Sequence, residues 1–405
     1  MNHIDLLARL AIENDSRIVL LVLDGVGDLR TADQPATALD RAELPNMDSL
    51  ARNSALGRIV PVSVGVTPGS GPGHLSLFGY EPTLPEADIG RGVLEALGLG
   101  LSVGPGDLTA RGNFATVDAD GNLTDRRAGR IPTAECQRLV DELQADLSSF
   151  EEARVEIFAG EEHRFVLILR GDGYSVDVAD TDPQKTGVPP LPPQPVTNES
   201  EATAALLAKI IARMNAVIAD EPRANTVLLR GVSQLPHLPQ FPDLYNLRAG
   251  AFAGYPLYRG VAGACGMEVI PCGKYFHEIV PTVRENWSDF DFFFVHVKQT
   301  DKAGEDGDLK TKIQVLEQVD AALPELLALE PTVLAITGDH STPAPLAAHS
   351  WHPVPLLVHS PVCFVDNCQE FTEAAATQGH LGTFPASELM GLLLANAGRL
   401  AKFGA

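Results

Sequence analysis

The sequence has little that suits a disulfide-stapled or membrane-embedded protein. Its five cysteines are an odd number at irregular spacings, with no CxxC pair, which disfavours both a zinc knuckle and a disulfide framework. No stretch reaches the roughly 18 consecutive apolar residues that a membrane helix needs. The first residues, MNHIDLLARLAIENDSR, carry acids early and have no long apolar segment, so we expect no signal peptide. These absences favour a soluble protein of the reducing cytoplasm.

Basic residues are also scarce. Only 30 lysines and arginines stand against 53 acidic residues, for a formal net charge of −23 over 405 residues. This balance disfavours a nucleic acid or an anionic membrane as a partner. A small anionic substrate remains compatible, because a few local arginines or metal ions can dominate a pocket. The apolar share of 45% is ordinary for a globular enzyme.

Long apolar runs near both ends of the chain predict buried strands. They lie at residues 17–25, 289–297 and 332–341, and such runs are typical of strands covered by helices on both faces. Residues 308–329 have apolar positions at helical spacing, which predicts a strand–helix–strand crossover with parallel strands. A short strand at 354–360 and a helix at 386–400 continue the pattern.

The middle of the chain differs. Short alternating segments between about 104 and 182 indicate antiparallel strands, the proline-rich segment 186–195 is an extended connector, and residues 199–220 form an amphipathic helix. We therefore predict an α/β fold with a mostly parallel sheet flanked by helices, over residues 1–103 and 221–405. A smaller α+β domain, residues 104–220, is inserted into it.

One serine stands among glycines and prolines in TPGSGPGHLSLFGY, residues 67–80. The stretch could be only a surface turn, because glycine and proline break regular structure. Alternatively, Ser70 could be a nucleophile at the start of a helix, where glycines let a phosphate approach the backbone. The stretch by itself leaves both interpretations open.

Acids and histidines cluster around the ends of the predicted parallel strands. Because ligands collect at the carboxyl ends of such strands, these side chains should converge and could hold one or two divalent cations. Each acid alone could be only a helix or turn cap, and each histidine a structural residue. The residues are Asp24, Asp301, Asp339, His340 and His349.

The predicted cluster of acids and histidines suggests a chemical role for Ser70. A serine hydroxyl is a poor nucleophile unless a base or a metal stabilises its alkoxide. A serine between glycines combined with a two-metal constellation therefore predicts phosphoryl transfer through a phosphoserine.

A series of stretches, in order along nearly the whole chain, carries a family resemblance. The stretches are VLDGVGD (22–28), PGSGPGHLSLFGYEP (68–82), GRGVLEALGLGL (90–101), RGNFATVD (111–118), DRRAGRI (125–131), EHRFVLILRG (162–171), DTDP (180–183), VKQTDKAGEDGD (297–308), ITGDHSTP (336–343) and AHSWHPVPLL (348–357). With them the sequence resembles the cofactor-independent phosphoglycerate mutases of the archaeal type, within the alkaline phosphatase superfamily.

The resemblance implies a role for each matching position. Ser70 would take the phosphoryl group and ligate the nearer metal with Asp24, Asp339 and His340, while Asp301 and His349 would hold the second metal. Cations from the insertion would grip the substrate, with Lys298 as a further candidate. The implied substrate-binding residues are Arg111, Arg127, Arg130, His163, Arg164 and Lys298.

Two positions depart from the family pattern. Glu305 in GEDG stands where a metal-binding histidine is expected, and an added oxygen ligand favours Mn²⁺ or Mg²⁺, with Zn²⁺ possible. His352 stands where a small polar residue is expected. It could ligate a metal or merely cap the following strand, and we favour the cap.

The implied activity is interconversion of 3-phosphoglycerate and 2-phosphoglycerate, a step of glycolysis and gluconeogenesis, without bisphosphoglycerate. The insertion would act as a lid, because water must be excluded while phosphoserine exists. One alternative is a metal-dependent phosphatase or phosphotransferase for another phosphomonoester. A second is a non-catalytic phosphate- or metal-binding regulator, in which Glu305 would mark a decayed site. The sequence does not indicate an oligomeric state.

Overall fold

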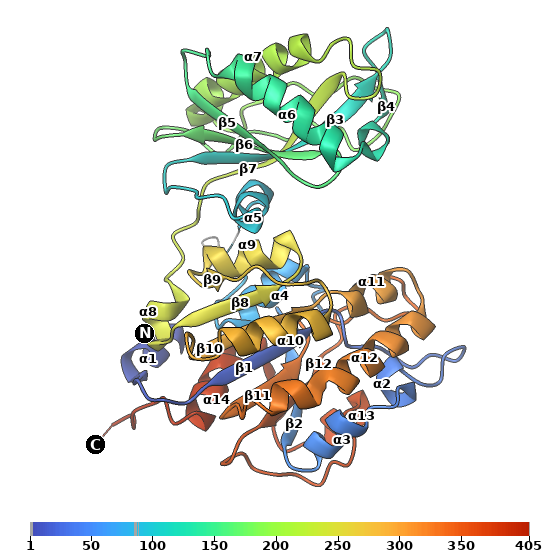
Figure 1. Cartoon of the computed structure of the whole chain (residues 1–405), viewed down its shortest axis with the longest axis vertical. Helices are drawn as coiled ribbons and strands as arrows, with labels where there is room; N and C mark the ends of the chain where they lie inside the picture. Colours follow the sequence, from blue (N-terminus) through green and yellow to red (C-terminus); the bar gives the residue numbers. More distant parts are fainter. Residues whose placement is uncertain (1–2, 85–86, 88, 405) are drawn as a thin grey trace. The chain divides into compact units, whose positions relative to one another are not determined.

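The computed structural model describes residues 3–84, 87 and 89–404. The chain folds as two compact units, a core unit formed by Met1–Asp88 and Leu238–Ala405 and an inserted unit formed by Ile89–His237. Figure 1 colours the elements along the chain. No helix in the described part of the chain is both long and apolar enough to cross a membrane.

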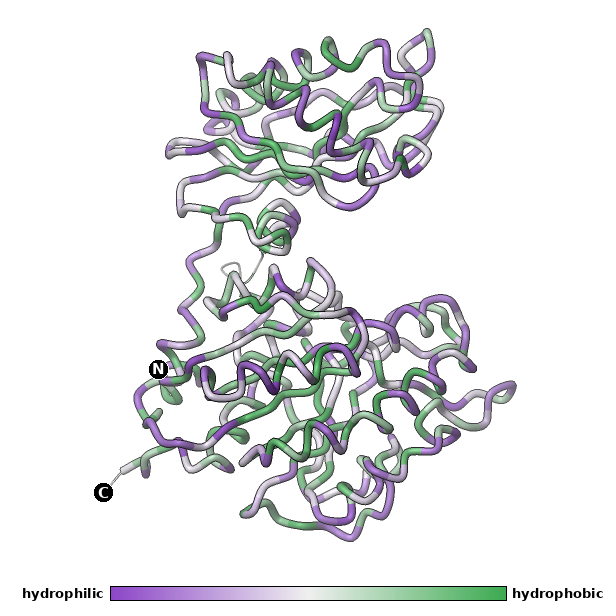
Figure 2. Tube along the Cα trace, viewed as in Figure 1, coloured by the Kyte–Doolittle hydropathy of each residue, from purple (hydrophilic) through white to green (hydrophobic). Residues whose placement is uncertain are grey.

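The core unit is organised around an eight-stranded sheet in the order β13-β2-β12-β11-β1-β10-β8-β9. Its strands are β1 (Ile18–Leu23), β2 (Ala55–Val60), β8 (Ala249–Ala253), β9 (Glu268–Val269), β10 (Phe292–Val297), β11 (Val333–Thr337), β12 (Val354–His359) and β13 (Gly382–Pro385). Every residue of β1, β10 and β11 is buried, and β1 is hydrophobic along its length in Figure 2. The prediction of a mostly parallel sheet with buried central strands is confirmed.

The sheet departs from the prediction at β12, which runs antiparallel to both β11 and β2. The segment between β11 and β12 contains turns and bends but no helix. A parallel return needs a crossover long enough to carry the chain back along the sheet, whereas a loop suffices for an antiparallel neighbour. The predicted continuation of the parallel pattern at 354–360 is therefore wrong in direction, although the strand exists.

Several helices of the core unit pack against one another. Helix α12 contacts α2, α3 and α10, while α4 contacts α9, and Figure 1 shows α10 and α12 crossing in front of the sheet. The helices are α1 (His3–Leu10), α2 (Ala38–Arg41), α3 (Pro45–Ala51), α4 (Ser70–Leu77), α8 (Phe241–Tyr245), α9 (Pro256–Ala264), α10 (Phe276–Glu285), α11 (Gln299–Glu305), α12 (Leu309–Leu327), α13 (Glu373–Gln378) and α14 (Leu389–Asn396).

The inserted unit is an antiparallel sheet with helices. Strand β3 (Leu108–Val117) pairs with β4 (Leu123–Asp125), β6 (Arg164–Arg170) and β7 (Thr226–Ser233), and β5 (Arg154–Ala159) pairs with β6. Its helices are α5 (Arg91–Gly98), α6 (Thr133–Leu147) and α7 (Glu201–Val217). The α+β character predicted for the insertion is present.

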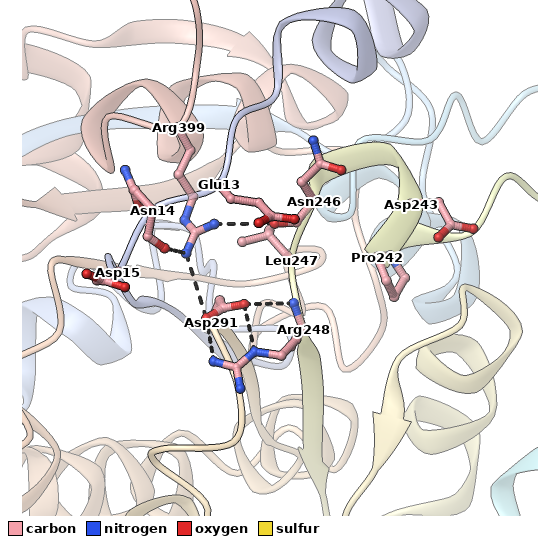
Figure 3. A pocket seen from close by; sticks show the side chains of 10 residues that line it. All are labelled: Glu13, Asn14, Asp15, Pro242, Asp243, Asn246, Leu247, Arg248, Asp291 and Arg399. Carbon is pink, nitrogen blue, oxygen red and sulfur yellow. Dashed lines mark hydrogen bonds and ion pairs between the residues drawn. The ribbon is translucent and has the colours of Figure 1, made fainter.

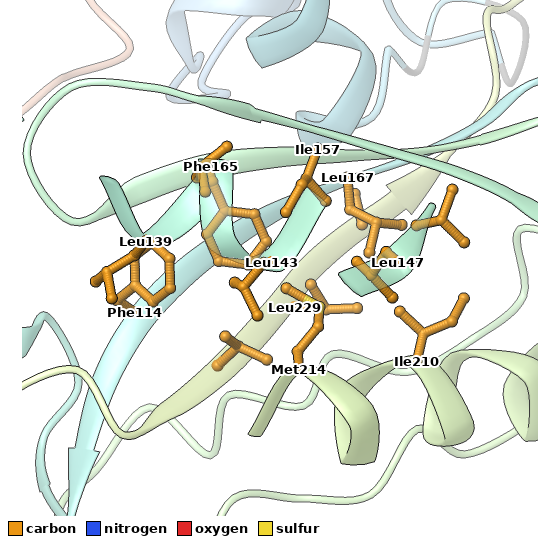
Figure 4. Packing of buried hydrophobic residues seen from close by; sticks show 14 of the residues in the cluster. Phe114, Leu139, Leu143, Leu147, Ile157, Phe165, Leu167, Ile210, Met214 and Leu229 are labelled. Atoms are coloured by element: carbon orange, nitrogen blue, oxygen red, sulfur yellow. The ribbon is translucent and has the colours of Figure 1, made fainter. Parts of the chain in front are cut away.

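The two faces of this sheet bury different side chains, because successive residues of a strand point to opposite sides. On β6, Phe165 and Leu167 join a large cluster with residues of α6 and α7, shown in Figure 4. Val166 and Ile168 instead pack with Ala96 of α5. The insertion thus has its own core.

The observed limits of the inserted unit differ from the predicted 104 and 220. Helix α5 packs on β3 and β7, and β7 hydrogen-bonds along β3, so both elements belong to the insertion although the sequence placed them in the core. The last part of the region predicted to hold antiparallel strands, residues 174–182, forms only an isolated bridge between Val178 and Pro195.

Candidate active site

The strand order brings the predicted metal ligands together at one edge of the core sheet. β1 lies between β10 and β11, parallel to both, with Leu23 beside Val297 and Val22 beside Thr337. The segments that follow these strands therefore leave the sheet side by side. They carry Asp24 after β1, Asp301 on α11 after β10, and Asp339 with His340 after β11.

The first cluster consists of Asp24, Asp339 and His340, all with no solvent exposure. The Nε2 atom of His340 lies 3.3 Å from Oδ1 of Asp24 and 3.2 Å from Oδ2 of Asp339. The side-chain oxygens of Asp24 and Oδ2 of Asp339 are buried without a hydrogen-bond partner. Buried carboxylate oxygens that accept no hydrogen bond are costly unless positive charge lies close to them, and their grouping around an imidazole nitrogen fits a divalent metal ion.

Ser70 is the first residue of α4, and its Oγ lies 3.3 Å from Nε2 of His340. The interpretation of this stretch as a helix start is therefore confirmed. Close packing fixes the position of the helix, since a Cβ atom on Gly73 would collide with the carbonyl oxygen of Asp339. In addition, Nδ1 of His74 donates to the Ser70 carbonyl at 2.8 Å and lies 3.2 Å from Oδ2 of Asp339.

The second cluster consists of Asp301, His340 and His349. Nε2 of His349 lies 3.4 Å from Oδ1 of Asp301 and 3.6 Å from Oε1 of Glu305. The imidazole rings of His340 and His349 stack with centroids 3.7 Å apart. Glu305 therefore lies beside the second cluster, with a side chain that is 53% exposed.

Lys298 lies among the acids of this site. Its Nζ is 3.3 Å from Oδ2 of Asp24 and donates to Oδ2 of Asp301. Burial would lower the pKa of Lys298, but the charges of Asp24 and Asp301 raise it. Burial would likewise raise the pKa of Asp301, but contacts with His349 and Lys298 lower it to about 2. Lys298 thus favours the charged form of the carboxyl groups of Asp24 and Asp301.

The other predicted substrate-binding residues gather in the inserted unit. They line a pocket of about 140 Å³, together with Asn113, Arg126, Glu162 and Arg230, which the sequence analysis did not select. The predicted residues in this pocket are Arg111, Arg127, Arg130, His163 and Arg164.

The charges of this pocket are only partly neutralised. Arg126 makes two 2.7 Å hydrogen bonds to Asp182, whereas Nε of Arg111 is buried without a partner. Burial, reinforced by the charge of Arg164, lowers the pKa of His163 to about 4. His163 is therefore neutral at physiological pH, and the excess positive charge comes from arginines, whose planar forks match carboxylate and phosphate oxygens.

The chain is similar to known proteins along its whole length. The family model for 2,3-bisphosphoglycerate-independent phosphoglycerate mutase matches residues 51–224. A protein of Thermotoga neapolitana described as a probable member is 50% identical over 399 residues, 98% of each chain. A counterpart in Thermus thermophilus is 49% identical over the full length of both chains. The chain belongs to the 2,3-bisphosphoglycerate-independent phosphoglycerate mutase family.

Solved structures support the same fold for this mutase family member. A protein from Pyrococcus horikoshii is 29% identical with a TM-score of 0.82, covering 96% of this chain and 99% of the other. A cofactor-independent phosphoglycerate mutase from Thermoplasma acidophilum is 28% identical with a TM-score of 0.72, covering 94% and 100%.

Two residues of this mutase family member border the first cluster but escaped the sequence analysis. Nε2 of His296 lies 3.2 Å from Oδ2 of Asp24, and the ring of Tyr258 stacks on that of His296 at 3.7 Å. His296 is the one polar residue of the strand FFFVHV. A histidine in an otherwise apolar strand could have indicated a site residue from the sequence. No sequence pattern indicated Tyr258, because it lies on α9 and reaches the site only through the tertiary fold.

His352 falls outside both of the candidate ligand groups. Its Nδ1 lies 3.0 Å from the hydroxyl of Ser350, and its carbonyl accepts a hydrogen bond from Ser341. This position at the start of β12 agrees with the strand cap that we favoured.

A larger pocket of about 530 Å³ also lies in the core unit of this mutase family member and is shown in Figure 3. Its two arginines share one acid, with Arg248 2.8 Å and Arg399 3.8 Å from the same Asp291 oxygen. It contains none of the predicted site residues. We therefore assign it a structural role.

Proposed function

We propose that this protein interconverts 3-phosphoglycerate and 2-phosphoglycerate without bisphosphoglycerate, through a phosphoserine at Ser70. The observation that carries the proposal is the 3.3 Å separation between Ser70 Oγ and His340 Nε2, beside buried carboxylate oxygens that accept no hydrogen bond. Membership of the mutase family supports the substrate assignment. Such an activity has its natural place in the cytoplasm, where the five unpaired cysteines among the described residues would stay reduced.

The metal ligands are proposed from the two clusters. Asp24, Asp339, His340 and Ser70 would hold one divalent cation, and Asp301, His349 and Glu305 the other. Bound there, the cations would stabilise the serine alkoxide and neutralise the phosphoryl oxygens. The donor set is rich in carboxylates, which favours Mn²⁺ or Mg²⁺ over Zn²⁺.

The chemistry on the protein side consists of two transfers. Ser70 Oγ attacks the substrate phosphorus, the Oγ–P bond forms, and the bond between phosphorus and the C3 oxygen breaks. After the glycerate reorients, its C2 oxygen attacks, so that the phosphoryl group leaves Ser70 and the free hydroxyl is restored. Positive charge near the transferring group is the main catalytic device for such steps.

We assign recognition of the substrate's anionic groups to the arginine pocket of the inserted unit. Among the described residues, no carboxylate forms an ion pair or a hydrogen bond with the guanidinium group of Arg111 or Arg130. Neutral His163 can donate or accept a hydrogen bond. We further propose that this unit serves as a lid, because phosphoserine must be protected from water.

The proposal is tested with metal-stripped protein and 3-phosphoglycerate in the absence of bisphosphoglycerate. Mn²⁺, Mg²⁺ or Zn²⁺ is added in turn, and 2-phosphoglycerate, free phosphate and trapped phosphoserine are measured. Ser70→Ala is run in parallel, with Ser63→Ala as the matched control because Ser63 is an exposed serine of the preceding loop.

We expect metal-dependent 2-phosphoglycerate and phosphoserine, both lost in Ser70→Ala and retained in Ser63→Ala. Free phosphate without 2-phosphoglycerate would instead establish the phosphatase alternative. Absence of phosphoserine with every metal would contradict the catalytic role of Ser70 and favour a binding protein.

A further inference from the structure

A lysine is buried beneath the candidate metal site. Lys312 on α12 has no solvent exposure, and its Nζ donates to the carbonyl oxygens of Gly25 at 3.0 Å, Gly27 at 3.2 Å and Thr342 at 2.9 Å. An ammonium group has three N–H donors and no acceptor. The number of carbonyls therefore matches the charged lysine, whereas a neutral amine would turn its lone pair toward one of them.

The three carbonyls belong to the two loops that carry the first cluster. Gly25 directly follows Asp24, and Thr342 is two residues after His340. The backbone N–H of Thr342 also donates to Gly27 at 3.0 Å. The loop after β1 and the loop after β11 are thus hydrogen-bonded to each other, and the ammonium group of Lys312 binds carbonyl oxygens of both.

Gly25 is held in a conformation that makes this convergence possible. Its φ is +61°, in the left-handed region that favours glycine. A Cβ atom there would collide with Oγ1 of Thr342 and lie 2.8 Å from Oδ1 of Asp301. The carbonyl directions at this turn are therefore set by close packing against Thr342 and against Asp301 of the second cluster.

The side chain of Thr342 links these loops to the second cluster. Its hydroxyl donates to Oδ1 of Asp301 at 2.6 Å and lies 3.0 Å from Nδ1 of His340. Because its one proton goes to the carboxylate, the hydroxyl accepts from Nδ1–H of His340. That tautomer leaves the lone pair of Nε2 facing Asp24, Asp339 and Ser70, as a metal ligand requires.

We propose that Lys312 is a positioning residue whose ammonium group serves as a built-in monovalent cation, fixing the loops of Asp24 and His340 and, through Thr342, Asp301. The inference rests on the metal-binding role proposed above. Without this cation the three carbonyls would repel one another, and the ligands of both clusters would lose their common geometry.

The first test compares variants by Mn²⁺ affinity rather than by turnover. Lys312→Met keeps the volume of the side chain but removes the charge, and Lys312→Ala also removes the chain beyond Cβ. Lys310→Ala is the matched control, because Lys310 is an exposed lysine of the same helix. Electron paramagnetic resonance of metal-stripped protein titrated with Mn²⁺ gives the dissociation constant for each folded variant.

We expect Mn²⁺ binding to weaken about tenfold or more in both Lys312 variants, as for loss of other groups that orient metal ligands, and to stay unchanged in Lys310→Ala. A lowered melting temperature with unchanged Mn²⁺ affinity would overturn the proposal, since it would show a structural role only. Failure of the unmodified protein to bind Mn²⁺ would reject the metal-binding role itself, and the inference with it.

Chemical rescue gives a sharper readout. n-Propylammonium supplies the three carbons and the ammonium group that Lys312→Ala lacks. Refolding Lys312→Ala with n-propylammonium should therefore restore Mn²⁺ affinity. Tetramethylammonium, which has no N–H donor, should not do so at equal ionic strength. Lys312→Met should not respond to either ion, because its side chain fills the space. Equal recovery with both ions would contradict a hydrogen-bonded cation.

A measurement on the unmodified protein covers the case in which the variants do not fold. Nitrogen-15 labelled lysine should show a protected ammonium signal that persists at neutral pH and survives Lys298→Met. Absence of such a slowly exchanging ammonium would overturn the proposal.

Discussion

The hydroxyl of Ser70 lies 3.3 Å from Nε2 of His340, although 270 positions separate the two residues along the chain. His340 also belongs to both ligand groups, with Asp24 and Asp339 on one side and with Asp301 on the other. One imidazole thus lies beside the candidate nucleophile, joins the proposed ligands of the first metal ion and stacks on His349, a proposed ligand of the second.

Replacing His340 should therefore affect both metal ions together. We expect His340→Ala to lower kcat by roughly 10³, comparable with loss of a major charge-stabilising group, and to lower the number of bound Mn²⁺ ions. Kinetics combined with elemental analysis measures both quantities. His352→Ala is the control, because His352 lies outside both groups. Retention of full metal content in His340→Ala, or an equal loss in His352→Ala, would contradict the assignment.

Glu305 should influence which metal the second cluster prefers. Its Oε1 is 3.6 Å from Nε2 of His349, so Glu305→Gln should weaken Mn²⁺ binding about tenfold. Glu305→His should raise activity with Zn²⁺ relative to Mn²⁺, because imidazole suits Zn²⁺. The ratio of the two activities is the measurement, with Asp306→Asn as an exposed neighbouring control. An unchanged ratio in Glu305→His would reject a ligand role for this position.

Two arginines of the same pocket should differ in what they contribute. Arg126 makes two hydrogen bonds to Asp182, whose side chain is 1% exposed. Its removal leaves a buried carboxylate with the backbone N–H of Gln184 and the longer contact to Arg230, so Arg126→Ala should lower the free energy of unfolding by about 2–3 kcal/mol. Arg130 is exposed, and Arg130→Ala should instead raise KM about tenfold, through loss of one charge-assisted hydrogen bond.

Urea unfolding and steady-state kinetics separate these two effects. Should Arg130→Ala destabilise the protein as much as Arg126→Ala while KM stays constant, the assignment of Arg130 to substrate binding is wrong.

Glu373 should make stability depend on pH. Burial raises its pKa to about 7 despite the hydroxyl of Thr37 and the charge of Lys312. Since the folded state binds this proton more tightly than the unfolded state, the associated stability is complete below the ordinary pKa and is lost as pH rises through 7. From pH 5 to pH 8, Glu373→Gln should therefore gain about 2–3 kcal/mol in unfolding free energy relative to the unmodified protein.

Urea unfolding at a series of pH values measures this difference, with the exposed Glu370→Gln as control. A constant difference between Glu373→Gln and the unmodified protein over this range would show that Glu373 does not bind the proton.

Several elements could be predicted because their signals are local. The continuous apolar runs of β1, β10 and β11 indicate burial on both faces, and the helical spacing of α12 indicates a crossover. By contrast, β2 and β8 were missed, because glycine and arginine interrupt the apolar residues of ALGRIV and β8 consists largely of alanine and glycine. Helix α6 has a buried face of Cys136, Leu139 and Leu143, yet it was also missed because its segment was interpreted as part of an alternating region.

The direction of β12 and the limits of the inserted unit could not be predicted in the same way. Both depend on partners chosen in three dimensions, namely β2 beside β12 and β3 beside β7. A strand's own residues carry its propensity and its buried face, but the identity of its neighbour depends on the packing of the whole sheet.

By itself the sequence determined the class of fold, the family and the residue types of the site. The apolar periodicity, the acids at the ends of strands and the serine between glycines can all be read from residues that are near one another in the chain. The tertiary structure alone decided that His340 belongs to both ligand groups, that His296 and Tyr258 border Asp24, and that Lys312 lies beneath the two loops. Those relationships join segments far apart along the chain, and only the parallel order of β11, β1 and β10 brings their ends to one edge.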